Sequence, residues 1–308
     1  MISINQDIVV WGNGRWANQY ISELHSLGFD SKNIHIFGNK LNYKSEIFCR
    51  QYSDLNDINF QRILKSSNIS LIVNSNRRHF DSLRIANKYG HNILCEKPLC
   101  ISNNDLDLQL EISNQNNLKF WESQIPLYSS YLNSLNSYLP SFSSFEIFWQ
   151  DKKSMSEVRG GFLKKHDLQL DYLYDVLPNI LSTLSCINIC STLSPLTLKA
   201  LKSSSSDSGE FILSRPSFQV KVFYSRISPK RIRKISASYS KSKSFIFDYS
   251  SEEKINVEFK GFSEEIPSFK KGPSSLKLQL KDFLSSDSSR PNFSISKSLL
   301  LNYPPYNK

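Results

Sequence analysis

The sequence predicts an α/β chain, with an N-terminal doubly wound parallel sheet followed by an α+β domain that has a large, mostly antiparallel open sheet. Two observations predict this class. Through about residue 123, apolar strand-like runs alternate with helical patterns, as in a parallel sheet flanked by helices. After that, short runs separated by turns show partial alternation of apolar and polar side chains, which favours antiparallel pairing.

A glycine-rich turn follows the first predicted strand, residues 7–11. Strand, turn and a helical pattern through Leu27 stand in the order of a Rossmann dinucleotide-binding unit, and Gly28 is expected to stop the helix. In the Gly-x-Gly-x-x-Ala pattern, the first glycine permits the tight turn and the second lets backbone approach a pyrophosphate. The small third residue lets helix and strand pack closely. The predicted cofactor contacts of this turn are Gly12, Gly14, Arg15, Trp16 and Ala17.

The residues after the second predicted strand, 33–37, bear on the choice of cofactor. An acidic residue is expected about 20 positions beyond the glycine motif, where it would bind the ribose hydroxyls of NAD. No acid stands there; Asn39 and Lys40 do. Because these side chains would accept a 2′-phosphate that a carboxylate repels, we expect NADP(H) to be favoured over NAD(H).

Two further strands are expected in the first domain, over 70–74 and 91–95, with a helix between them from about Phe80 to Tyr89. The second of these strands ends in Glu96-Lys97-Pro98. Proline fixes its own backbone torsion and removes an N–H, so the strand ends there in a defined direction. Lys97 would then present a cation to a bound ligand, and the carboxylate beside it could orient that cation.

This order of parts resembles the glucose-fructose oxidoreductase / inositol dehydrogenase (Gfo/Idh/MocA) family of nicotinamide-dependent sugar oxidoreductases. The matching pieces are the glycine turn, Asn76-x-x-His79, the run Gly90–Cys95 and Glu96-Lys97-Pro98. Gln124-Ile-Pro126 looks like the family's domain-crossing segment, although an arginine is usual at Gln124. The segment 275–283 looks like its late helix, which packs back on the first domain. The resemblance implies a dinucleotide-binding domain over 1–123 and a substrate and oligomerisation domain over 124–308.

The resemblance also implies roles for single residues. Lys97 would sit beside the nicotinamide and the reacting oxygen, where an ammonium can polarise that oxygen and share its proton. Pro98 would follow a cis peptide bond. Asn76 and His79 would line the nicotinamide side of the site. The predicted cofactor contacts beyond the glycine turn are Asn39, Lys40, Asn74, Asn76, His79, Glu96 and Lys97.

The sequence departs from the family pattern in the segment that usually supplies an acid–base histidine. After Gly160-Gly161, an ungapped match places Lys165 and Gln169 on the family's Asp and His. With two inserted residues, Asp167 and Asp171 take those places, and a different gap brings in His166. The candidates for acid–base catalysis beside Lys97 are therefore His166, Asp167 and Asp171. On a helix, Asp167, Asp171 and Asp175 would form one acidic stripe.

The second domain is expected to contain a helix over 166–190 and a series of strands. The predicted strands are 142–150, 196–201, 210–214, 218–224, 231–239, 244–248 and 254–260. The serine run 203–206 is expected to be a loop. The region 199–243 holds eleven Lys or Arg against two acids, which is +9 of the formal net charge of +10. No base-reading motif accompanies it, so we do not expect a nucleic-acid partner.

Composition is typical of a globular chain, with 39% hydrophobic and 21% charged residues among 308. No run of 18 apolar residues and no signal-like segment is present, so we expect no membrane span. The five cysteines form neither a metal-binding spacing nor a disulfide framework, which favours the cytoplasm and no metal site.

The expected function is that of an NAD(P)-dependent oxidoreductase that transfers hydride between the nicotinamide and a sugar, a nucleotide-sugar or a related cyclic polyol. The alternative is a non-catalytic member that binds cofactor and acts as a regulator or assembly partner. The displaced histidine favours the alternative, and the intact Glu96-Lys97-Pro98 favours the enzyme. A homo-oligomer through the C-terminal sheet is also expected from the resemblance.

Overall fold

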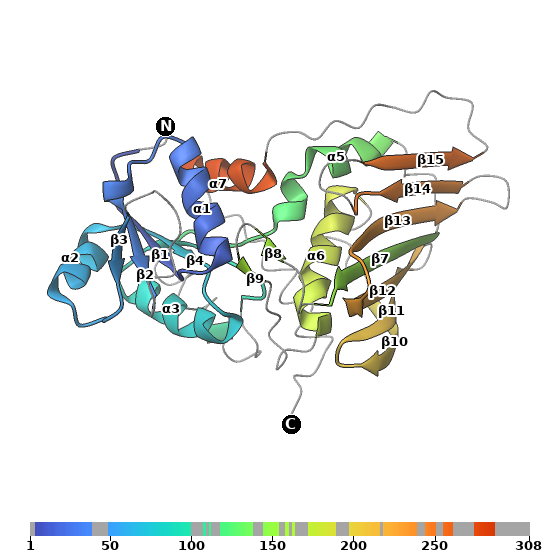
Figure 1. Cartoon of the computed structure of the whole chain (residues 1–308), viewed down its shortest axis with the longest axis horizontal. Helices are drawn as coiled ribbons and strands as arrows, with labels where there is room; N and C mark the ends of the chain where they lie inside the picture. Colours follow the sequence, from blue (N-terminus) through green and yellow to red (C-terminus); the bar gives the residue numbers. More distant parts are fainter. Residues whose placement is uncertain are drawn as a thin grey trace. The chain divides into compact units, whose positions relative to one another are not determined.

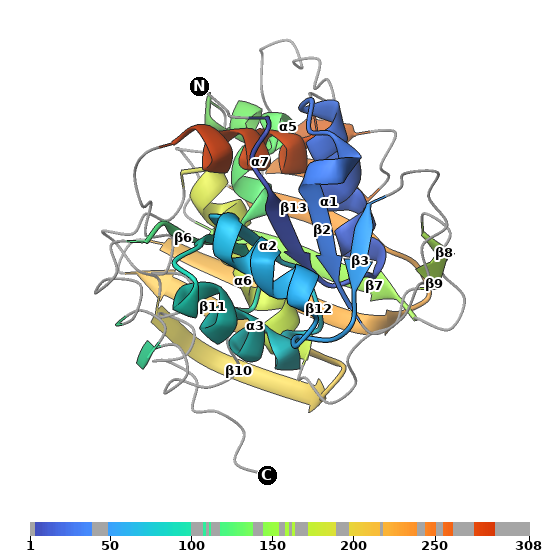
Figure 2. The same cartoon turned by 90° about the vertical axis from the view of Figure 1, so that its left-hand side faces the viewer.

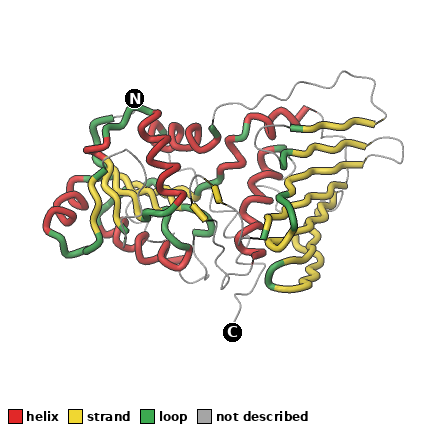
Figure 3. Tube along the Cα trace, in the orientation of Figure 1, coloured by secondary structure: helices red, strands yellow, loops and turns green. Residues whose placement is uncertain are grey.

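The computed structural model describes residues 4–38, 49–99, 107–108, 111, 118–137, 144–153, 158–159, 162–163, 172–188, 197–215, 218–238, 244–250, 255–260 and 274–286. The chain divides into two compact units. The first unit comprises Met1–Tyr128 and Pro273–Lys308, and the second comprises Ser129–Gly272. Helices and strands alternate in the first, whereas strands dominate the second (Figure 3).

The first unit is built on a six-stranded sheet in which every pairing is parallel. Its order, β3-β2-β1-β4-β5-β6, is that of the doubly wound dinucleotide-binding fold. The predicted parallel sheet is therefore confirmed. Its strands are β1 (Ile8–Trp11), β2 (Ile34–Phe37), β3 (Arg50–Tyr52), β4 (Ile69–Ile72), β5 (Asn92–Cys95) and β6 (Phe120–Glu122).

Helices cover both faces of this sheet because its strands are apolar on both sides. One face packs in a single buried cluster with α1 (Arg15–Ser26) and α7 (Ser275–Ser285). The opposite face packs against α2 (Ile58–Ser66) and α3 (Asn76–Lys88), as when Phe60 contacts the Trp11 ring at 5.9 Å. Figure 2 shows α2 and α3 next to each other, and the Tyr89 hydroxyl donates to Gln61 Oε1 at 2.6 Å between them.

Helix α3 starts four residues before the predicted start at Phe80. Ser75 has an extended backbone and ends the segment after β4, and the Arg78 N–H already donates to the Ser75 carbonyl. The polar residues 76–78 carry no apolar periodicity, so the sequence pattern did not reveal this turn. Helix α7 begins at a serine cap, since Ser274 Oγ accepts the Lys277 N–H.

The second unit is built on a seven-stranded sheet, ordered β10-β11-β12-β7-β13-β14-β15. All its pairings are antiparallel except that of β12 with β7, so the predicted mostly antiparallel sheet is confirmed. Its strands are β7 (Ser144–Lys152), β10 (Thr197–Ser205), β11 (Ser208–Arg215), β12 (Phe218–Ser228), β13 (Ile232–Ser238), β14 (Ser244–Asp248) and β15 (Asn256–Lys260). A separate two-stranded pair joins β8 (Val158–Arg159) and β9 (Phe162–Leu163).

The predicted loop at the serine run 203–206 is wrong for its first three residues, which belong to β10. Ser203 pairs with Gly209 and Ser205 with Ser208, so a two-residue turn closes a hairpin here. β10 lies at the edge of the sheet, where a serine run is tolerated because the partner strand supplies the hydrogen bonds. Pairing thus overrides the weak strand propensity of serine.

The faces of this sheet differ in burial. Alternate side chains such as Ile147, Val222 and Ile235 are fully buried. Helix α6 (Tyr172–Cys186) lies along this face, as Figure 1 shows, and the Tyr172 ring lies 6.2 Å from the Tyr224 ring. Next to α6 lies the short helix α5 (Ser130–Asn133). The side chains between the buried ones form the more exposed face.

Among the described residues, no helix has the length and apolar character needed to cross a membrane.

Candidate functional site

The glycine turn joins β1 to α1 in a conformation that only glycine adopts readily. Gly12 has φ +131°, and a Cβ placed there would lie 2.9 Å from the Asn74 backbone nitrogen. Its N–H donates to the Phe37 carbonyl at 2.8 Å. The turn is thereby held between the ends of β2 and β4.

Gly14 differs from Gly12 because a Cβ placed there would meet nothing within 4 Å. It precedes α1, whose first turn has no acidic residue and no side-chain cap. The first N–H groups of a helix and its dipole favour an anion, so a phosphate group fits this open space. Ala17, fully buried, packs α1 against the sheet. Arg15 and Trp16 are half-buried, with the guanidinium carbon 5.2 Å from the indole ring centre.

The segment after β4 carries Asn74, Asn76 and His79. Asn74 Nδ2 donates to Ser82 Oγ at 2.8 Å, and Asn76 is the first residue of α3. His79 is fully buried, with Nδ1 2.8 Å from the Pro98 carbonyl oxygen and Nε2 3.1 Å from that of Asn74. Burial lowers the pKa of His79 to about 4, so the ring is neutral near pH 7 and donates one of these hydrogen bonds. The ring therefore links α3 to the turn after β5.

Glu96, Lys97 and Pro98 follow β5 directly. Glu96 is 7% exposed and Lys97 is half-buried. The Lys97–Pro98 peptide bond is cis, as the resemblance predicts. Burial raises the pKa of the Glu96 carboxyl, while hydrogen bonds from Tyr20 and Ser123 and the charge of Lys97 oppose that rise.

The sheet brings these segments to one edge. β1, β4 and β5 are neighbours and run parallel, so the glycine turn, Asn74 and Lys97 all follow the carboxyl ends of adjacent strands. In open α/β sheets, ligands bind at this edge. The predicted site residues that the structure describes therefore all lie in the segments that follow these three strands.

Five predicted site residues lie outside the described part of the chain. These are Asn39, Lys40, His166, Asp167 and Asp171. Gly38, which ends the segment after β2, is described just before Asn39, and Tyr172, which begins α6, is described just after Asp171. Asp175, the third member of the predicted acidic stripe, lies in the first turn of α6.

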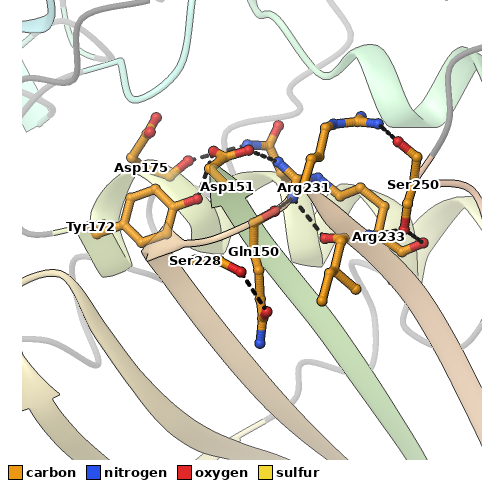
Figure 4. Close-up of polar contacts among 10 residues, drawn as sticks. Gln150, Asp151, Tyr172, Asp175, Ser228, Arg231, Arg233 and Ser250 are labelled. Carbon is orange, nitrogen blue, oxygen red and sulfur yellow. Dashed lines mark hydrogen bonds and ion pairs between the residues drawn. The ribbon is translucent and has the colours of Figure 1, made fainter. Parts of the chain in front are cut away.

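The second unit contains a buried polar cluster at the start of α6 (Figure 4). Arg233 is 5% exposed and Asp151 is 6% exposed; they form an ion pair at 2.5 Å. Tyr172 donates to the other oxygen of Asp151 at 2.7 Å. Burial, and next the Asp151 charge, raises the pKa of Tyr172 well above its usual range. A second buried arginine, Arg226, pairs with Asp207 at 2.5 Å.

The contacts of this cluster continue around Arg233. Its guanidinium lies 4.0 Å from the Trp149 ring centre and donates to the Gln150 carbonyl. Ser228 donates to Gln150 Oε1 at 3.1 Å, and Arg231 donates to the Ser250 carbonyl (Figure 4). The buried charges here have partners, which is the arrangement of a structural ion-pair network.

The sequence pattern did not indicate several of the interacting residues, namely Tyr20, Ser123, Asp151, Arg233 and Gln279, whose Oε1 lies 3.1 Å from Ser123 Oγ. One signal was present for Tyr20: it lies on the apolar face of α1 beside Ile21 and Leu24, and a buried tyrosine requires a hydrogen-bond partner. No comparable signal marked the others. Among the described residues, no group of three or more His, Cys, Asp or Glu side chains could hold a metal ion.

Solved structures share this fold at low sequence identity. A 3-ketoreductase from Actinomadura kijaniata, in complex with NADP and TDP-benzene, matches with a TM-score of 0.72 and 10% identity, over 95% of this chain and 94% of its own. A UDP-N-acetylglucosamine 3-dehydrogenase from Acidithiobacillus ferrooxidans matches with a TM-score of 0.68 and 14% identity, over 90% and 87%. A dehydrogenase from Clostridium difficile matches with a TM-score of 0.67 and 13% identity, over 96% and 98%.

These matches confirm the predicted fold, which solved reductase and dehydrogenase structures share. At such identities, the likeness concerns the fold alone. No family model and no curated protein sequence matches the chain.

Proposed function

We propose that the chain is a nicotinamide-dependent oxidoreductase of the glucose-fructose oxidoreductase / inositol dehydrogenase type, acting on a sugar, a nucleotide-sugar or a related cyclic polyol. One observation carries the proposal: the open glycine turn and Lys97 lie along the same carboxyl edge of the sheet, after β1 and β5, the two strands that flank β4. In this fold, that edge takes a dinucleotide.

The residues at that edge fit a dinucleotide. The space over Gly14 and the uncapped start of α1 suit a pyrophosphate, and Arg15 adds a positive charge beside them. Asn74, Asn76, Glu96 and Lys97 remain the proposed contacts on the nicotinamide side. We assign dinucleotide binding to the first unit and substrate recognition to the second.

The bound nicotinamide would supply or accept the hydride. Lys97 would hold the substrate oxygen with its ammonium and share a proton with it as that oxygen gains or loses charge. His166, Asp167 and Asp171 remain the proposed acid–base partners. The structures that share the fold support a nucleotide-sugar substrate, because one is a UDP-N-acetylglucosamine 3-dehydrogenase and another was solved with TDP-benzene.

We propose NADP(H) as the favoured cofactor because Asn39 and Lys40 replace the acid expected after the second strand. Fluorescence titration should show tighter binding of NADPH than of NADH. Equal or tighter binding of NADH would contradict this preference.

Turnover tests the enzymatic proposal directly. The chain should oxidise or reduce at least one member of a panel of UDP- and TDP-sugars and free cyclic polyols, measured by NADPH absorbance. Lys97→Ala should lower kcat by a factor on the order of 10²–10⁴, because it removes a positioned proton donor. Lys88→Ala is the matched control, because Lys88 is an exposed lysine in the last turn of α3. Cofactor binding without turnover on the whole panel would instead favour the non-catalytic alternative.

We also propose a homo-oligomer through the more exposed face of the seven-stranded sheet. One row on that face crosses all seven strands: Lys202, Glu210, Phe223, Phe148, Lys234, Asp248 and Asn256. At its centre the Phe148 and Phe223 rings stack at 4.8 Å, and charges of both signs flank them. Such a row can pair with a copy of itself. Light scattering of Phe148→Glu should give a smaller particle than the unaltered chain.

A further inference from the structure

A buried hydrogen-bond network surrounds Glu96, the residue just before Lys97. Glu96 Oε1 accepts the Tyr20 hydroxyl at 2.7 Å and the Ser123 hydroxyl at 2.9 Å. The two hydroxyls lie 2.9 Å apart, and Ser123 is 3.1 Å from Gln279 Oε1. None of these four side chains is more than 7% exposed.

The members of the network come from separate parts of the first unit. Tyr20 lies in α1, the helix that the glycine turn begins, and Gln279 lies in α7. Ser123 follows β6, and its N–H donates to the Cys95 carbonyl at 2.7 Å. Glu96 is thus held at the point where α1, α7 and the ends of β5 and β6 meet.

The network reaches the backbone of Lys97. The Glu96 carboxylate also accepts a hydrogen bond from the Lys97 N–H. On the other side, the carbonyl of Pro98 faces His79 Nδ1 at 2.8 Å. The backbone on both sides of Lys97 is therefore held by buried side chains, while Lys97 itself is only half-buried.

Burial of a carboxylate is energetically unfavourable, because the charged form loses its hydration. An apolar side chain would fill the same space without that desolvation cost. Here the carboxylate receives hydrogen bonds from two hydroxyls and one backbone N–H. Such hydrogen bonds favour the ionised form and hold it in one orientation. A fixed carboxylate beside the proposed catalytic lysine can set where the ammonium lies.

We propose that Tyr20 and Ser123 are positioning residues, which hold the Glu96 carboxylate so that Lys97 meets the reacting oxygen in one geometry. This inference rests on the proposed function. It predicts that removing one hydroxyl, at a distance from any substrate, weakens the reaction without weakening cofactor binding.

The test compares Tyr20→Phe with Tyr128→Phe. Tyr20→Phe removes the hydroxyl that donates to Glu96 and leaves the ring. Tyr128→Phe removes a hydroxyl that donates to Asp282 of α7 at 2.8 Å. Tyr20→Phe should lower kcat by about tenfold to a hundredfold, the usual effect of a small misplacement, with the Kd of NADPH within about twofold. Tyr128→Phe should leave both unchanged, and Ser123→Ala should follow Tyr20→Phe.

The pH profile separates positioning from a loss of packing. The groups that face Glu96 are Lys97, Tyr20 and Ser123, and Cys95 lies beside Tyr20. The Tyr20 hydrogen bond lowers the pKa of Glu96, so its removal raises that pKa further. The ionised carboxylate is then lost at a higher pH, and the acid limb of kcat should move to higher pH in Tyr20→Phe. An unmoved limb with kcat near that of the unaltered chain would overturn the inference.

A second measurement keeps the inference testable if no substrate is found, an outcome that would count against the proposed function alone. Acetic anhydride labels lysine amines, and mass spectrometry gives the rate at Lys97 relative to Lys88. Tyr20→Phe should change this ratio severalfold, because the carboxylate no longer fixes Lys97, whereas Tyr128→Phe should not. The same ratio in both variants and the unaltered chain would refute the positioning role.

Discussion

At the scale of single residues, His79 shows how burial controls a protonation state. The ring is fully buried and its pKa is about 4, against an ordinary value of 6.5. Between these pH values the unfolded chain binds a proton that the folded protein does not. The contribution of His79 to the free energy of unfolding is therefore fully present above pH 6.5 and is lost as the pH falls from 6.5 towards 4.

The size of this effect gives a prediction. This difference in pKa between the unfolded and the folded chain lowers the free energy of unfolding by about 3 kcal/mol when the pH has fallen to 4. His79→Gln removes the titrating ring, so its free energy of unfolding should depend less steeply on pH between 6.5 and 4. Urea unfolding of both chains at several pH values measures this. Parallel pH dependences would show that His79 is not responsible.

At the scale of elements, the Asp151–Arg233 ion pair joins β7 to β13, and Tyr172 joins α6 to the same carboxylate. Its value for stability depends on whether one partner or both are changed. Removal of one leaves an uncompensated buried charge, whereas replacement of both by apolar residues is often neutral. The main role of the Asp151–Arg233 pair is therefore to specify that β7, β13 and α6 meet here, and its net contribution to stability is small.

Two substitutions test this account. Asp151→Asn should destabilise the second unit by about 3–5 kcal/mol, because Arg233 stays buried without its counter-charge. Glu210→Gln is the matched control, since the Glu210–Lys221 pair at 3.0 Å is much more exposed. Its cost should be within about 1 kcal/mol. Equal costs in denaturant unfolding would contradict the structural role of the buried pair.

The same elements show what can be predicted from sequence. The glycine turn and the strands around it carry local signals, since apolar runs and the spacing of Gly12, Gly14 and Ala17 are read within a few residues. Residues that are far apart in the sequence and meet only in the fold carry no such local signal. Tyr20 and Glu96 stand 76 positions apart, and Arg233 and Asp151 stand 82 apart, so their pairing depends on topology and register. The serine end of β10, residues 203–205, likewise depends on its pairing with β11, whereas the apolar start of that strand was predicted.

At the scale of the whole molecule, the two compact units can unfold in separate transitions. NADPH at 100 times its Kd should stabilise the first unit by about 2.7 kcal/mol and leave the second transition in place. Gly14→Val should abolish this shift without lowering basal stability, because a Cβ there meets no atom within 4 Å. Calorimetry with and without NADPH measures both. A shift retained in Gly14→Val would place the cofactor elsewhere.

The position of α7 has a consequence for synthesis on the ribosome. Leu276, Leu280 and Phe283 complete the apolar cluster that covers one face of the first sheet, and they follow the entire second unit in the chain. At 5–20 residues per second, roughly 10–30 s separate the appearance of residue 128 from that of residue 285. During that interval the nascent first unit carries an apolar face that α1 covers only in part. Chaperones that bind such surfaces would meet this chain while it is still being made.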